Sequence, residues 1–214
     1  GAAKPTTDVR KIMMADYCTS LLSTPHILRK VSPTRQVSAE LHRLHDLPRK
    51  IMEERGIHMG LGLGGITTPM CELLAKGLVN KLVDTQDFDQ VPSSPSRQIR
   101  TTSRSLRPST RTRSTSAYVN KLDFVILASL EVDVNFNCNV VVGSDGMITG
   151  AQGGHPDTAA GAKCTIVIAP LLQGRIPAIC TNVTTVTTPG ESVDVVITDY
   201  GIAINREDRI SSSA

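Results

Sequence analysis

The sequence predicts a mixed α/β fold in which helices pack against buried strands of aliphatic residues. Aromatic residues make up only 3% of the 214 residues and tryptophan is absent, whereas 40% of the residues are hydrophobic. The core therefore has to be built from Val, Ile, Leu and Ala, as in a buried parallel sheet. Continuous apolar runs that end in glycine-containing turns supply the strands, and two segments with helical spacing supply the helices.

A helix is expected near the start of the chain. The polar cluster at residues 6–8 is a plausible helix start. Apolar side chains then recur at helical spacing, at Val9, Ile12, Met13, Tyr17 and Leu21. We expect this apolar stripe to face the core.

A strand, a turn and a helix are predicted in succession within residues 51–90. Residues 61–63 are expected to end a short buried strand, and the two glycines that follow are expected to form a tight turn. The helix should be capped by Thr67 or Thr68, with Pro69 at its first position. Gly77 is a stop signal for this helix, and residues 81–84 predict a further strand.

Most of the strand signals lie in residues 117–205. Continuous apolar runs predict buried strands at residues 124–127, 165–168 and 193–197. Apolar residues alternate with acidic and amide residues at Val132, Val134 and Phe136, which also predicts a strand. Two further runs are each followed by a turn: an apolar run at 140–142 with a turn at 143–146, and a β-branched run at 184–188 with a turn at 189–190. The segment 157–163 is rich in alanine and other small residues, which suits a short helix or turn packed close to a sheet.

Two basic stretches, residues 25–50 and 91–116, differ from the rest of the chain. The second holds six arginines and no acidic residue. It can be interpreted as a disordered nucleic-acid-binding arm, as a solvated linker, or as an out-of-frame translation. We favour the last, because a permitted codon choice read two bases later turns part of each stretch into ordinary globular sequence. The lack of aromatic residues that could stack on bases also argues against the nucleic-acid arm.

The first candidate site is the glycine-rich run at residues 60–67, in which Gly62, Gly64, Gly65 and Thr67 are the candidate cofactor-binding residues. A strand-to-helix turn of this kind exposes backbone N–H groups beside a helix N-terminus. Such groups favour phosphates, other anions or a developing oxyanion. The structural alternative is that the glycines allow tight packing.

The second candidate site contains Gly153, Gly154, His155 and Asp157. Two glycines let the backbone approach a ligand, and the histidine and the aspartate add an ionisable pair. Alternatively, Asp157 caps the next element and His155 is a buried hydrogen-bonding group. Arg175 is either a surface ion-pair partner or a group that holds a substrate carboxylate. The turns at 188–191 and 199–201 are expected to be structural. The five cysteines and five histidines show no metal-ligand spacing, so no metal site is expected.

Several long runs resemble the alpha subunit of citrate lyase, a family within the CoA-transferase group. They include GIHMGLGLGGITTPMCELLAKGLV, NKLDFVILASLEVDVNFN and GSDGMITGAQGGHPDTAAGAK. The resemblance covers residues 1–24, 51–90 and 117–205. It implies an open three-layer α/β/α CoA-transferase-like (NagB/RpiA-like) fold that is incomplete here. Residues 1–205 would belong to its C-terminal domain, with 25–50 and 91–116 out of frame and poorly ordered and 206–214 a divergent tail.

The resemblance also implies an activity. The alpha subunit transfers the acyl group between acetyl-carrier protein and citrate, which gives citryl-carrier protein and acetate. It binds no cofactor of its own and acts on a dephospho-CoA-derived prosthetic group of the gamma (acyl carrier) subunit, and a beta subunit then cleaves the citryl thioester. A cytoplasmic location without a membrane anchor is expected. The alternative is a non-enzymatic RNA-binding protein that uses residues 91–116.

Two site features follow from the resemblance. GIHMG stands where covalent CoA-transferases read GIHTE, so Gly60 takes the position of their catalytic glutamate and no glutamyl-CoA intermediate is expected. Gly153, Gly154, Asp157 and, by the same analogy, His155 fall in the GGQxD loop that those enzymes hold near the thioester. The N-terminal half of the family is missing here, so we expect the chain alone to be inactive or weakly active.

Overall fold

The computed structural model describes residues 7–22, 24, 35–39, 52–53, 58–66, 68–87 and 118–205. The chain divides into two compact units, Gly1–Asp123 and Phe124–Ala214. The described residues do not include 91–116, 206–214 or most of 25–50. The prediction that the two basic stretches are poorly ordered therefore concerns residues that lie outside the described part of the chain. The exception is Arg35–Ala39, which forms a strand.

In the first unit, helix α1 (Val9–Leu22) confirms the predicted helix, but of the predicted apolar stripe only Leu21 is buried. The backbone N–H of Arg10 donates to the Asp8 carboxylate at 3.1 Å, which is a typical N-terminal cap. The buried residues are Met14, Ala15, Cys18 and Leu21, whereas Val9, Ile12 and Met13 are exposed. The helix carries apolar residues on more than one side, so periodicity alone could not select the side that packs.

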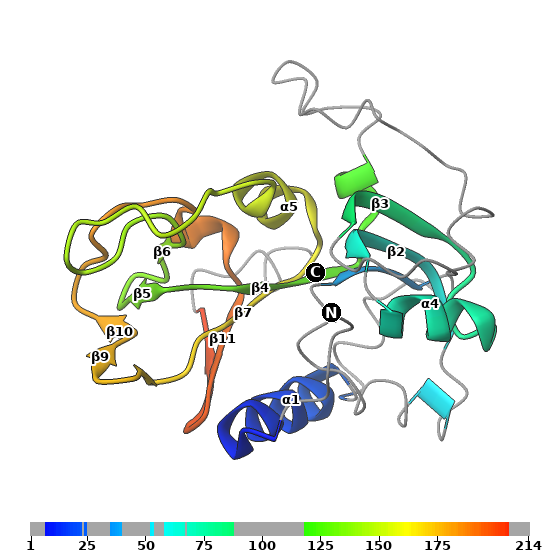
Figure 1. Ribbon diagram of the computed structural model, residues 1–214, viewed down its shortest axis with the longest axis horizontal. Helices are drawn as coiled ribbons and strands as arrows, with labels where there is room; N and C mark the ends of the chain where they lie inside the picture. Colours follow the sequence, from blue (N-terminus) through cyan, green and yellow to red (C-terminus); the bar gives the residue numbers. More distant parts are fainter. Residues whose placement is uncertain are drawn as a thin grey trace. The chain divides into compact units, whose positions relative to one another are not determined.

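The first unit also holds three parallel strands in the order β1 (Arg35–Ala39), β2 (Met59–Ile66) and β3 (Leu82–Asp87) (Figure 1). Strand β2 does not stop at residue 63 as predicted. It continues through a register shift between Gly64 and Gly65, so a bulge replaces the expected tight turn. Helix α4 (Thr68–Ala75) follows, with Pro69 at its second position, and Gly77 lies just beyond its end.

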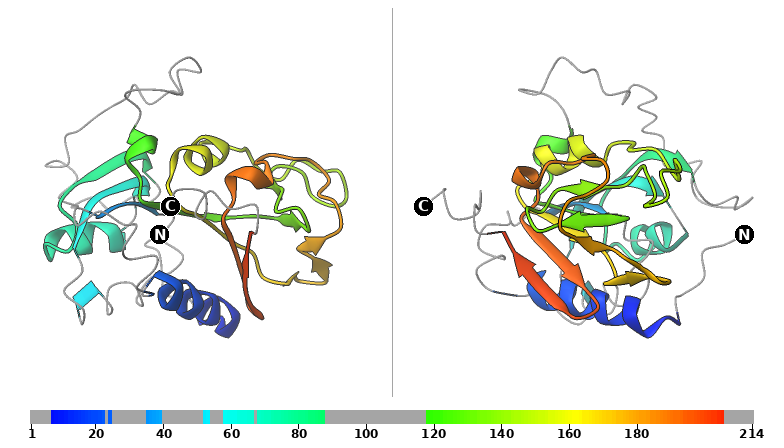
Figure 2. Two further views of the ribbon diagram at one scale, coloured as in Figure 1. Left: turned by 180° about the vertical axis from the view of Figure 1, so that it is seen from behind. Right: turned by 90° about the vertical axis from the view of Figure 1, so that its left-hand side faces the viewer.

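The second unit is built on parallel strands β4 (Phe124–Ala128), β7 (Thr165–Ile168) and β11 (Val195–Thr198), with β12 (Gly201–Ile204) antiparallel at the edge. These strands confirm the three predicted apolar runs, although β11 begins two residues later than expected. Helix α5 (His155–Gly161) lies over one face of these strands, as the views in Figures 1 and 2 show. Its fully buried Ala159 shows that small residues allow this close packing, as predicted.

A small sheet continues from the carboxyl end of β4, in the order β10 (Ile179–Cys180), β5 (Glu131–Asp133) and β6 (Cys138–Asn139). A hairpin of β8 (Leu172–Gln173) and β9 (Ile176–Pro177) precedes it, and the short helix η4 (Gly190–Ser192) follows. The predicted strand through Val134 and Phe136 is wrong beyond residue 133. Val134 is 65% exposed, and Phe136 has a φ of 64° in a turn.

The apolar run at 140–142 forms only an isolated bridge between Val142 and Ile148, although the turn after it is confirmed. In the β-branched run at 184–188, only Thr188 forms a bridge, and its partner is Cys138. Each of these two runs therefore forms a single β-bridge and no regular strand. Their side chains and backbone groups instead serve the polar network described below.

Candidate functional site

The His155 ring joins three segments of the second unit. Its Nδ1 atom lies 2.7 Å from the Thr188 hydroxyl, and its Nε2 atom lies 3.2 Å from the backbone carbonyl of Ala128. These partners come from the carboxyl end of β4 and from the segment before η4. His155 is 9% exposed and Thr188 is fully buried. The geometry therefore fits the alternative in which His155 is a buried hydrogen-bonding group.

The two contacts assign the tautomer of this ring. A carbonyl oxygen can only accept, so Nε2 carries the proton that is donated to Ala128. Nδ1 is then the acceptor, and the Thr188 hydroxyl donates to it. Burial lowers the pKa of His155 from 6.5 to about 4, although the Ala128 carbonyl acts in the opposite direction. The ring is therefore neutral at pH 7 and has no free nitrogen for proton transfer.

The turn before His155 presents two backbone N–H groups. Gly153 has a φ of 53°, a left-handed conformation that glycine adopts without strain, and Gly154 is the N-cap of α5. The turn is closed by a 3.0 Å hydrogen bond from the His155 N–H to the Gln152 carbonyl. Both glycines are exposed, and no described residue accepts a hydrogen bond from either N–H group. These two groups can bind an anion or an oxyanion.

Asp157 does not cap α5 as the structural alternative expected. The helix begins at His155, so Asp157 lies within its first turn, and no side chain makes a cap hydrogen bond there. Its exposed carboxylate instead lies at the N-terminal end of the helix, where a negative charge is favoured.

The glycine-rich run belongs to the first unit and is used at least partly for packing. A β-carbon on Gly62 would come within 2.8 Å of both Leu82 Cδ2 and Met70 Cε, so glycine lets β3 and α4 approach β2. Gly64 and Gly65 form the bulge described above. Thr67 lies outside the described residues.

Arg175 lies on the loop between β8 and β9, and its side chain is exposed. It makes no hydrogen bond or ion pair with any other described residue. The hairpin itself is anchored, because the Gln173 side chain donates to the Ser129 carbonyl at 3.0 Å, just beyond β4. The guanidinium is therefore available to a carboxylate, and the ion pair of the structural alternative is not formed within the described part of the chain.

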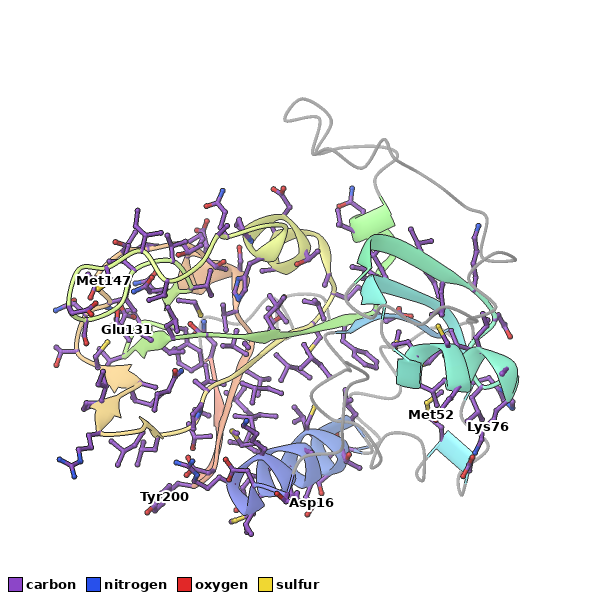
Figure 3. All side chains as sticks on the ribbon, in the orientation of Figure 1. Asp16, Met52, Lys76, Glu131, Met147 and Tyr200 are labelled. Atoms are coloured by element: carbon purple, nitrogen blue, oxygen red, sulfur yellow. The ribbon has the colours of Figure 1, made fainter. Side chains whose placement is uncertain are left out.

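Sequence reasoning missed two buried carboxylates on β5. Glu131 is 7% exposed and accepts hydrogen bonds from Asn139 Nδ2 at 2.7 Å, from the Thr184 N–H at 3.0 Å and from the Thr184 hydroxyl at 3.2 Å. Burial raises the pKa of Glu131, but these hydrogen bonds outweigh it and the pKa lies below its usual value. Figure 3 shows Glu131 where β5 continues from β4.

Asp133 has the same role two residues further along β5. Its carboxylate accepts hydrogen bonds from the N–H groups of Asn135 at 2.9 Å and Asn137 at 3.0 Å, and from the Asn137 side chain at 3.1 Å. Together the two acids hold the 134–142 loop and the 181–190 segment, from which Thr188 reaches His155. The asparagines and threonines that follow β5 were the available signal, because they supply the donors that buried acids need.

Glu131→Gln is expected to lower the free energy of unfolding at pH 7 by about 2 kcal/mol, because its amide group would face the donors of Asn139 and Thr184. The folded-state pKa of Glu131 is lowered, so its stabilisation is present above the ordinary value of 4.5 and is lost as the pH falls below it. The difference between the two proteins should therefore shrink in acid. Urea unfolding at several pH values measures this, with the exposed Glu191→Gln as control; a difference independent of pH would contradict it.

The described residues hold no cluster of three or more His, Cys, Asp or Glu side chains suited to a metal ion. No disulfide joins the five cysteines, of which Cys18, Cys138 and Cys164 are buried. Within the segments that the structure describes, no helix is long and apolar enough to cross a membrane.

Comparison with known proteins places these features in a family. The family model "Citrate lyase, alpha subunit" matches residues 1–211. The citrate lyase alpha chain of Haemophilus influenzae is 41% identical over 208 residues, which cover 96% of this chain and 41% of that protein. The chain thus spans about two-fifths of the length of this curated relative.

Comparison with solved structures leads to the same family. A crystal structure described as the alfa subunit of citrate lyase in complex with citrate, from Streptococcus mutans, is 36% identical, with a TM-score of 0.77 over 97% of this chain and 41% of that one. The 4-hydroxybutyrate CoA-transferase of Porphyromonas gingivalis is 16% identical, with a TM-score of 0.59 over 98% of this chain and 51% of that one. This likeness is one of fold and confirms the predicted CoA-transferase-like class. With a family model matched over nearly its whole length, the chain belongs to the citrate lyase alpha subunit family.

Proposed function

We propose that this chain supplies a portion of the site at which a citrate lyase alpha subunit exchanges acetyl for citryl on the thiol of a carrier protein. The supporting observation is the pair of N–H groups at Gly153 and Gly154, unengaged by any described residue, in a turn held by the buried His155. The family match and the relative described with bound citrate point to the same chemistry. They lend no support to the RNA-binding alternative.

The exchange balances without any further reagent. A citrate carboxylate oxygen attacks the acetyl thioester carbonyl, the carbon–sulfur bond breaks, and a mixed anhydride and a thiolate result. The thiolate then attacks the citryl carbonyl of the anhydride, and acetate leaves. Each step passes through a tetrahedral oxyanion. Backbone N–H groups aimed at such an oxygen are typically worth a factor of about 100 to 1,000 in rate each.

The other candidate residues take supporting roles in this proposal. Arg175, whose exposed guanidinium has no partner among the described residues, would hold a citrate carboxylate, and Asp157 would lie beside the thioester loop. Of the glycine-rich run, Gly64 and Gly65 would contact the dephospho-CoA-derived arm, which is a substrate carried by the gamma subunit, whereas Gly62 is buried and its N–H donates to the Lys81 carbonyl at 2.8 Å. The beta subunit would cleave the citryl thioester afterwards. Gly60 has no side chain that could form a glutamyl thioester, which suits direct exchange in a ternary complex.

A complementation assay tests the proposal. Because the chain spans about two-fifths of its relative, we expect it alone to release little acetate from acetyl-carrier protein and citrate. Addition of a polypeptide that covers the remaining residues of the Haemophilus influenzae protein should restore citrate-dependent acetate release. The full-length relative serves as the positive control. If it turns over while the complemented mixture stays inactive, the proposal is wrong.

A further inference from the structure

We infer that Thr188 is a positioning residue: its hydroxyl fixes the orientation of the His155 ring, and the ring so oriented holds the Gly153–Gly154 turn in the geometry that receives the thioester oxygen. This inference rests on the proposed function. It concerns a residue that the sequence did not single out, 33 positions from its partner.

The ring needs one donor and one acceptor in these surroundings. The Ala128 carbonyl demands a donor at Nε2, which leaves Nδ1 as a buried acceptor that only the Thr188 hydroxyl satisfies among the described residues. Without that hydroxyl the acceptor would be left unpaired on a side chain that is only 9% exposed. The Ala128 carbonyl would still keep the proton on Nε2, but the ring would gain by turning until Nδ1 meets another donor.

Thr188 is suited to this task because its backbone is fixed independently of the histidine. Its N–H donates to the Cys138 carbonyl at 3.1 Å, and its carbonyl accepts from the Cys138 N–H at 2.9 Å. Two residues later, the Gly190 N–H donates to the Asn137 side chain at 2.9 Å. The hydroxyl is therefore presented from a fully buried, doubly paired position, and not from a flexible loop.

The ring anchors the residue that directly follows the two glycines. His155 follows them in sequence, and its N–H closes the turn onto the Gln152 carbonyl at 3.0 Å. Thr158 fixes the other side, since its N–H and its hydroxyl both donate to the Gly154 carbonyl, at 2.9 and 2.8 Å. A ring that loses one of its two anchors would let His155 shift, and with it the preceding peptide and the neighbouring N–H groups. Sub-ångström displacements of this kind lower rates more than they weaken binding.

The experiment compares Thr188→Val, which keeps the shape but removes the hydroxyl, with Thr188→Ser, which keeps the hydroxyl. Exposed Thr185→Val on the same segment is the matched control. In the complemented mixture we expect Thr188→Val to lower kcat by about 10-fold to 100-fold with the KM for citrate little changed, because small misplacements of catalytic groups cost up to about 100-fold in rate. Thr188→Ser should restore most of the rate, and Thr185→Val should behave as the parent protein.

A spectroscopic readout separates this inference from the proposed function. In 15N-histidine-labelled chain, the His155 ring should show the Nε2–H tautomer in all three proteins, because the Ala128 carbonyl sets it. The Nδ1 resonance should show an accepted hydrogen bond in the parent protein and in Thr188→Ser, and it should shift in Thr188→Val, which lacks the donor. An unchanged Nδ1 resonance in Thr188→Val would overturn the inference, as would an unchanged kcat in a mixture whose parent protein is active. An inactive parent mixture beside an active full-length relative would instead count against the proposed function, and the Nδ1 measurement would still decide whether Thr188 holds the ring.

Discussion

Asn139→Asp is expected to lower the free energy of unfolding at pH 7 by about 4 kcal/mol, because it places a second carboxylate against a buried one. Asn139 is fully buried. Its Nδ2 atom donates to Glu131 Oε2 and to the Val142 carbonyl, both at 2.7 Å, and its Oδ1 atom accepts from the N–H groups of Val141 and Val142, both at 3.1 Å. The substitution leaves one oxygen satisfied and turns the other toward two acceptors with no proton between them.

The loss of stability in this variant should also shrink in acid, but because the variant gains stability there and not because the parent protein loses it. Two carboxylates in contact share one proton, so the folded-state pKa of the pair is raised above the unfolded value. A raised pKa means that stability is present at low pH and is lost as the pH rises through it. Urea unfolding at about pH 5 and about pH 7.5 should therefore show the variant regaining some of its stability in acid.

Two controls make the result specific to the buried network. Exposed Gln152→Glu adds the same negative charge outside it and should leave stability nearly unchanged. The double variant E131Q/N139D exchanges the carboxylate and the amide, so that one donor again lies between them, and it should be more stable than the sum of the single losses predicts. A loss below about 1 kcal/mol for Asn139→Asp would mean that the network is open to water.

The elements of the fold that the sequence predicted well are those fixed by local composition. The apolar run that became β4 has no polar residue whose direction must be chosen, and Thr165 is the one polar residue of β7, so the burial of both strands follows from hydrophobicity. The prediction for the β5 region failed because the alternation of apolar and polar residues does not mark where the strand ends. Val132 is buried, but the strand stops at Asp133, and the acids at 131 and 133 are also buried, among amide and hydroxyl donors.

The residues of the candidate site were likewise predicted only where the signal is local in the sequence. The glycines at 153 and 154 were found because a turn of this type leaves a signature within a few residues. The partner of His155 was not found, because the contact joins positions 33 residues apart and depends on how the 181–190 segment returns to β6. Thr188 looks like any other residue of a threonine-rich run until the fold pairs its backbone with Cys138.

Gly190→Ala is expected to lower the free energy of unfolding by about 3 kcal/mol, because the added methyl group has no room. A β-carbon on Gly190 would collide with the Asn135 carbonyl oxygen and would lie 3.0 Å from the carbonyl carbons of Asn135 and Phe136. These are backbone atoms, so no side chain can rotate away. The turn cannot shift easily either, because Asp133 holds both the Asn135 and Asn137 N–H groups.

Gly154→Ala is the matched control, since its β-carbon would make only an ordinary 3.9 Å contact with Thr158 Cγ2 and its φ of −91° suits any residue. It should change stability by less than about 1 kcal/mol and can be slightly stabilising. Urea unfolding of the two variants gives the comparison, and equal stabilities would contradict the close approach at Gly190. Because Gly190 follows Thr188 by two residues, a displaced turn should also lengthen the hydroxyl–imidazole contact. Gly190→Ala should therefore share the shifted His155 Nδ1 resonance of Thr188→Val, whereas Gly154→Ala should not.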